Sequence, residues 1–110
     1  MVSAKTNGAY VPTIYREFVR DYPAVANAYE AFASAVHDAG PLDERTRRLV
    51  KFAAAVGAGS EGAVRSHARK ALAAGISRQE IEHVILLAAP NVGLPTSIAA
   101  LGWAREVFGS

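Results

Sequence analysis

Glycine and proline divide this chain into short segments that are rich in alanine. Alanine accounts for 23 of the 110 residues, and it favours helices because its side chain loses no rotamer entropy there. The β-branched residues are scattered singly and do not alternate with polar residues as they would along strands. The sequence therefore predicts an all-α fold, a compact bundle of about six helices.

Turn and capping residues give the expected helix boundaries. A first short helix opens at Pro12, and a second begins at Pro23 and ends at Gly40-Pro41. Ser60 and Ser77 are good N-caps for later helices, and the left-handed conformation common after helix ends suits Gly75. Pro90 is expected to kink or end its helix. The remaining helices are predicted over about 43–57, 60–75, 77–90 and 96–108.

Apolar residues at helical spacing predict which faces are buried. The run Val84–Ala89 is apolar all round, which predicts a helix buried on most sides, and the last helix is apolar on more than one face. So many apolar faces need more neighbours than one short chain supplies, which favours a homo-oligomer. The expected stripe of the second helix is Val25, Tyr29, Phe32 and Val36, and that of the third is Leu42, Thr46, Leu49, Val50, Ala53 and Val56.

The composition restricts the domain organisation and the location of the protein. We expect residues 1–10 to form an N-terminal arm and residues 11–110 a single helical domain. No signal peptide or membrane span is visible, and a chain without cysteine suits the cytoplasm. A formal net charge of +2 gives no indication of nucleic-acid binding.

His67 is the strongest candidate for chemistry. It falls within a stripe of small and apolar residues on the predicted helix 60–75, where an imidazole with a shifted pKa could serve as a general base. The alternative is a core histidine whose ring is satisfied by a backbone carbonyl. Glu61 lies about 120° away around the helix and is spaced to pair with Arg65. No two histidines stand at metal-ligand spacing, so the sequence predicts neither a metal site nor a cofactor.

Several segments together resemble a known family. They are Leu42–Val50, Ser60–His67, Ala74–Ile81 and Gly93-Leu94-Pro95 with the following helix to Phe108. Their order and spacing over about residues 41–108 resemble the carboxymuconolactone decarboxylase family, within the alkylhydroperoxidase D-like superfamily. The resemblance implies an all-α fold of that type, usually assembled as trimers or hexamers.

The resemblance can be followed residue by residue. In the peroxidase branch two cysteines and a glutamate accompany the histidine that corresponds to His67, whereas this chain has Ser60, Ala63 and Arg48 at those positions. A serine cannot pass through sulfenic acid and disulfide states, so this chain alone is not expected to be a thiol peroxidase. The decarboxylase branch has a glutamate at position 63, a second histidine at position 87 and a tyrosine at position 91. Here these positions hold Ala63, Leu87 and Asn91.

Two hypotheses of different class follow, and the sequence leaves open whether the protein is an enzyme. The first is cofactor-free acid–base chemistry of decarboxylase or lyase type on a small anionic organic acid or lactone. His67 would be the catalytic residue, and Ser60, Glu61 and Arg48 would contact the substrate. The second is a non-catalytic, oligomeric binding or scaffold protein that kept the fold and lost the chemistry.

Overall fold

The computed structural model describes residues 12–109, and these residues form six α-helices and no strand. The expected all-α fold of six helices is confirmed. Residues 1–10, the predicted arm, lie outside the described residues, and a single domain over 11–110 stays a prediction. The helices are α1 (Thr13–Asp21), α2 (Pro23–His37), α3 (Glu44–Ala58), α4 (Glu61–Ala73), α5 (Arg78–Val92) and α6 (Leu94–Gly109).

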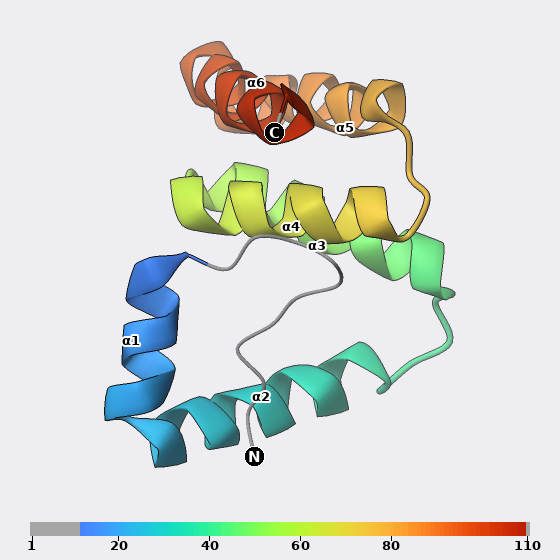
Figure 1. The fold of residues 1–110 in the computed structure, drawn as a ribbon. Helices are drawn as coiled ribbons and strands as arrows, with labels where there is room; N and C mark the ends of the chain where they lie inside the picture. Colours follow the sequence, from blue (N-terminus) through green and yellow to red (C-terminus); the bar gives the residue numbers. More distant parts are fainter. Residues whose placement is uncertain (1–11, 110) are drawn as a thin grey trace. The chain divides into compact units, whose positions relative to one another are not determined.

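The helices fall into two compact units, one with α1 and α2 and the other with α3 to α6. In the first unit, α1 and α2 meet at a sharp bend at Tyr22 (Figure 1), where Pro23 excludes a helical conformation for the residue before it. Among the residues described in this unit, Ala26 alone is buried. The predicted stripe of α2 is therefore left exposed, with Tyr29 at 63% and Phe32 at 65% exposure.

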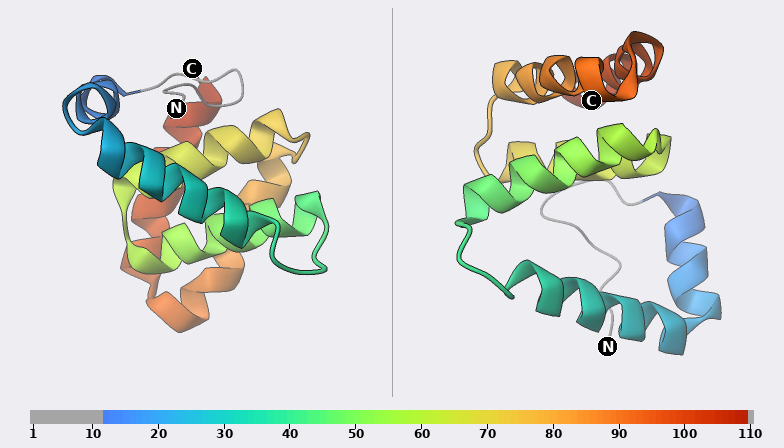
Figure 2. Two further views of the ribbon diagram at one scale, coloured as in Figure 1. Left: turned by 90° about the horizontal axis from the view of Figure 1, so that it is seen from below. Right: turned by 180° about the vertical axis from the view of Figure 1, so that it is seen from behind.

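The second unit consists of two helical hairpins stacked in two layers. Figure 1 and the right-hand view of Figure 2 show the α3–α4 hairpin in one layer and the α5–α6 hairpin in the other. None of the six helices described is long and apolar enough to cross a membrane.

Local capping sets the ends of these helices, as the sequence predicted for Ser60, Ser77 and Gly75. The Asp43 carboxylate accepts a hydrogen bond from the backbone N–H of Thr46 at 2.8 Å, and the Ser60 hydroxyl accepts one from Ala63 at 3.3 Å. Ser77 begins α5 with a full capping box. Gly59 and Gly75 follow α3 and α4 with φ angles of +65° and +88°, which strongly favour glycine.

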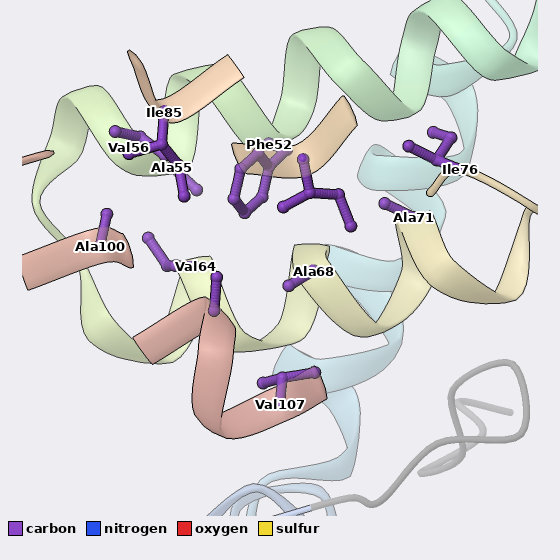
Figure 3. Packing of buried hydrophobic residues seen from close by; sticks show 12 residues of the cluster. Phe52, Ala55, Val56, Val64, Ala68, Ala71, Ile76, Ile85, Ala100 and Val107 are labelled. Carbon is purple, nitrogen blue, oxygen red and sulfur yellow. The ribbon is translucent and has the colours of Figure 1, made fainter. Parts of the chain in front are cut away.

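The core of the second unit is built around Phe52 of α3. Figure 3 shows its ring between α3 and α4, and it is fully buried. Small residues of α4 and α6 let the helices approach closely around it, which follows from the alanine content. The residues packed in this cluster are Phe52, Ala55, Val56, Val64, Ala68, Ala71, Ile76, Ile81, Ile85, Ala100, Ala104 and Val107.

Two further expectations about burial, for α3 and α5, were wrong in part. Val56 of the predicted inner face of α3 is fully buried and Leu49 packs against the core, but Val50 is exposed, and so is Leu42 before the helix. The buried side is shared with Phe52 and Ala55, which were not predicted to face inward. The apolar run in α5 is not buried on most sides, because Leu86 and Leu87 are 61% and 62% exposed while Ile85 faces the core. Of the two outcomes expected at Pro90, a kink or an end of the helix, the helix does not end there. Two further residues complete the last turn of α5, where proline removes only one backbone donor near the end of the helix.

Candidate functional site

His67 lies at the edge of the buried face of α4. Val64, Ala68 and Ala71 of that face are fully buried, and His67 is half-buried beside them. Its Nδ1 atom is inaccessible to solvent and has no hydrogen-bond partner among residues 12–109. The alternative of a core histidine whose Nδ1 bonds to a backbone carbonyl is therefore not what the structure shows. Such an atom is costly to leave unpaired, which makes it a place to look for a ligand.

The surroundings of His67 favour its neutral form. Burial is the largest cause, and it is followed by the positive charges of Lys70, Lys51 and Arg48. Together they lower the pKa of His67 to about 4. The imidazole is therefore uncharged at neutral pH and has a lone pair that can accept a proton.

The three cations come from two neighbouring helices. Glu44, Arg48 and Lys51 follow one side of α3 at helical spacing, and Ala63, His67 and Lys70 follow one side of α4 in the same way. Lys51 and His67 are each eight residues from Gly59, at which the hairpin turns. Residues equally far from a hairpin turn lie at about the same level, and the positive charge of Lys51 indeed acts on His67 across the two helices. We refer to Arg48, Lys51 and Lys70 as the α3/α4 cation cluster.

Arg48 of the cluster is paired with a carboxylate. Nε of Arg48 donates to Glu44 at 2.6 Å, and the Arg48 side chain is only 16% exposed. Burial lowers the pKa of Lys51, and the positive charges of Arg48 and Lys70 lower it further, against a smaller opposing effect of Glu44. The cluster thus places positive charges beside an imidazole that is neutral at ordinary pH.

The structure brings two of the four predicted site residues together. Arg48 acts directly on the pKa of His67. Ser60 caps α4 seven residues earlier, roughly 10 Å away along the helix axis. Glu61 points elsewhere and pairs with Arg65 at 3.0 Å, as its spacing predicted, while Arg65 also reaches Glu106 at 2.6 Å.

The sequence shows Lys51 in a basic cluster with Arg45, Arg47 and Arg48, which could be a solvated face or could meet an acidic substrate or a neighbouring subunit. It did not connect Lys51 with His67, and it did not indicate Lys70. The signal that could have found them is the symmetry of the hairpin about Gly59, because it places position 51 opposite position 67 without knowledge of the structure. Lys70 then follows as the residue three positions after His67 on the same side of α4.

Two surface cavities lie elsewhere in the second unit. One of about 380 Å³ separates α3 from α5 and is almost entirely apolar, with Leu87 and Asn91 in its wall. The other, of about 310 Å³, is bordered by Gly59 and by Trp103 and its neighbours on α6. His67 lines neither of them. Between residues 12 and 109, no three or more histidine, aspartate or glutamate side chains are grouped so that they could hold a metal ion.

Comparison with known proteins gives a consistent result. The sequence model of the carboxymuconolactone decarboxylase family matches residues 23–106. A 4-carboxymuconolactone decarboxylase of Acinetobacter baylyi is 37% identical over 67 residues, which are 61% of this chain and 50% of that protein. An uncharacterized protein of Haemophilus influenzae is 32% identical over 67 residues, which are 61% of this chain and 59% of that protein. The chain thus matches only half to three-fifths of the length of these relatives.

Proposed function

The chain belongs to the carboxymuconolactone decarboxylase family, and we propose that it performs cofactor-free acid–base chemistry of decarboxylase or lyase type. The substrate would be a small anionic organic acid or lactone, and His67 would be the base that takes a proton from it. The name of the Acinetobacter relative supports this class of reaction.

One observation carries the proposal: Nδ1 of His67 is buried, unpartnered and uncharged, beside cations that can hold an anion. In the free protein these cations oppose protonation of the ring. An anionic substrate would offset their charge, so that the imidazole becomes a better base only when the substrate is bound. Arg48 would hold a negative group of the substrate.

We also propose Ser60 and Glu61 as substrate contacts, at a place separate from His67 and Arg48. Both lie at the first turn of α4, where backbone N–H groups and the helix dipole favour a negative charge. That turn lies roughly 10 Å from His67 along the helix axis, so a small substrate held there would not contact His67 at the same time.

A thiol peroxidase function is disfavoured for this chain. It contains no cysteine, and the thiol chemistry of peroxide reduction needs one that can be oxidised and regenerated.

A non-catalytic binding or scaffold role is the alternative. It is favoured by the position of the two cavities, neither of which is lined by His67. Ala63 and Leu87 also cannot move protons, although they stand where the decarboxylase branch has an acid and a second histidine.

We also propose that the chain acts as a homo-oligomer, a trimer or a hexamer. The support is the row of apolar side chains that α2 leaves exposed. It consists of Val25, Tyr29, Phe32 and Val36, each more than half exposed.

The enzyme proposal can be tested with a panel of small carboxylic acids and lactones that includes 4-carboxymuconolactone, with loss of CO₂ or of the lactone as the readout. His67→Gln should lower kcat/KM by roughly 100-fold or more because the proton acceptor is lost. His83→Gln is the matched control, since His83 is exposed on α5, and it should keep the wild-type rate. Turnover by His67→Gln at the wild-type rate would refute the proposal, and binding without turnover would favour the non-catalytic alternative.

A further inference from the structure

We infer that the exposed row of α2 docks into the apolar groove between α3 and α5 of a second copy of this chain. We refer to Val25, Tyr29, Phe32 and Val36 as the α2 row, and to the cavity between the two helices as the α3/α5 groove. The inference rests on the oligomer proposed above and deepens it, because it names the surface that receives the row. It does not depend on whether the protein is an enzyme.

The α2 row lies on a helix that is poor in charge. Among the fifteen residues of α2, Glu30 is the one acid, and there is no lysine or arginine. A helix of this composition is normally buried on several sides, yet Tyr29 and Phe32 are 63% and 65% exposed. Aromatic side chains remove more surface from water on burial than most others do, so the row gains much from a partner that covers it.

The α3/α5 groove is the concave apolar surface of the second unit. It lies between one helix of each layer (Figure 1) and has a volume of about 380 Å³. Val50 and Leu87 in its wall are 52% and 62% exposed, so the groove is open to a partner. The residues that line it, of which Asn91 is the one polar member, are Leu49, Val50, Ala53, Val84, Leu87, Ala88, Asn91 and Val92.

The two surfaces agree in length and in chemistry. The α2 row extends over eleven residues, from Val25 to Val36, or roughly 16 Å along the helix axis. The α5 wall of the groove, from Val84 to Val92, is roughly 12 Å long. Since neither the row nor the wall of the groove contains a charged side chain, no charge has to be removed from water when the row enters the groove.

The difference between the two surfaces determines the symmetry of the assembly. A row that packs against the same row of another copy makes a two-fold contact, which joins two chains and then ends. A row that enters the groove of the next copy leaves the row of that copy available for a third. Such a head-to-tail contact can repeat until a ring closes. A ring of three, as in a trimer or in each half of a hexamer, requires a contact of this second kind.

The area of the row also favours a ring. Tyr29 and Phe32 have about two-thirds of their surface left to bury, which amounts to roughly 200–300 Å² for the pair. A stable interface covers about 800 Å² on each partner, so a single contact through the row is small. In a ring every chain uses its row and its groove at once, which roughly doubles the area that each chain buries.

The test compares two neighbouring leucines of α5. Leu87 lines the groove and Leu86 does not, although their exposures are 62% and 61%. Leu87→Ser should lower the mass measured by light scattering from that of the wild-type oligomer toward that of a single chain, because it puts a polar group in the wall of the groove. Leu86→Ser is the matched control and should keep the wild-type mass. Both variants should keep the helix content of the wild type by circular dichroism, since both leucines are exposed.

A mixture of variants tests the head-to-tail contact itself. Phe32→Ser keeps an intact groove and Leu87→Ser keeps an intact row, so their mixture at high concentration should contain a species of two chains. Each variant alone should remain a single chain under the same conditions. The inference is overturned if the mixture stays monomeric, or if Leu86→Ser dissociates as much as Leu87→Ser does.

The same measurements separate this inference from the proposed oligomer. If Phe32→Ser dissociates while Leu87→Ser keeps the wild-type mass, the oligomer stands but the row does not occupy the groove. A wild type that is monomeric, as it would be if α2 covered the groove of its own chain, would contradict the oligomer and the inference together.

Discussion

Lys51 of α3 and His67 of α4 are each eight residues along the sequence from Gly59, and the ammonium group of Lys51 acts across the hairpin on the imidazole of His67. This relationship connects the geometry of the α3–α4 hairpin with the ionisation state of His67. The same close packing of small residues that holds α3 against α4 also buries one side of His67 and places cations beside it. The environment of His67 is thus a consequence of the packing of α3 against α4.

The lowered pKa of His67 predicts a pH-dependent stability. In the unfolded chain the imidazole has its ordinary pKa of 6.5, whereas in the folded protein the pKa is about 4. Between these values the unfolded state binds more protons, so the free energy of unfolding should decrease as the pH falls, by up to about 3 kcal/mol in total. Urea denaturation at a series of pH values measures this.

His67→Gln provides the control for that prediction. Glutamine does not titrate, so the variant should lack the part of the pH dependence between about pH 4 and 6.5 that His67 causes. The explanation fails if the wild type and the variant lose the same amount of stability over this range.

Phe52 should be the most sensitive position of the core. Its ring is fully buried at the centre of the α3–α4 hairpin, so Phe52→Ala should lower the free energy of unfolding by about 3–5 kcal/mol. Val50→Ala, two residues away but 52% exposed, should cost less than about 1 kcal/mol. Chemical denaturation of both variants measures these losses. If Val50→Ala lowered the free energy of unfolding more than Phe52→Ala does, then Val50 and not Phe52 would face the core.

The orientation of α3 also shows where the sequence was sufficient and where it was not. Caps and turns act through neighbouring residues, so Ser60, Ser77 and Gly75 could be assigned correctly from local patterns. The buried face of α3 could not be assigned in this way, because Leu49, Val50 and Phe52 are all apolar. Only the packing partners on α4 and α5 decide which of them faces the core.

The candidate site was predictable to a similar extent. His67 stood out because an imidazole within an apolar stripe is unusual, and Arg48 because of its position in the family pattern. The contribution of Lys51 depends on a contact between two helices, and that contact had to be deduced from the hairpin as a whole. Leu86 and Leu87 were predicted to be buried but are exposed. An apolar run in the sequence does not reveal how many other helices pack around it.

Arg65 is expected to make a small, salt-sensitive contribution to stability. It bridges Glu61 of its own helix and Glu106 of α6, at 3.0 and 2.6 Å. Both glutamates are more than half exposed, so Arg65→Gln should cost about 0.5–1 kcal/mol in dilute buffer and less in high salt. Thermal denaturation at two salt concentrations tests this, and a loss that does not depend on salt would show that the ion pairs are not its source.

The exposed row on α2 predicts how the proposed oligomer could be disrupted. Phe32→Ser should lower the mass measured by light scattering toward that of a single chain, because it places a polar group in the middle of the row. Asn27→Ser, on the same helix but outside the row, should keep the wild-type mass. A wild-type protein that is monomeric at all concentrations would contradict the proposal.

The most direct test of the central claim is an NMR titration of His67 in the free protein, compared with Lys51→Gln. If burial and the neighbouring cations hold the imidazole neutral and ready to accept a proton, the wild-type midpoint lies near pH 4 and the variant midpoint is higher. A wild-type midpoint at the ordinary value of about 6.5, unchanged in Lys51→Gln, would contradict the account.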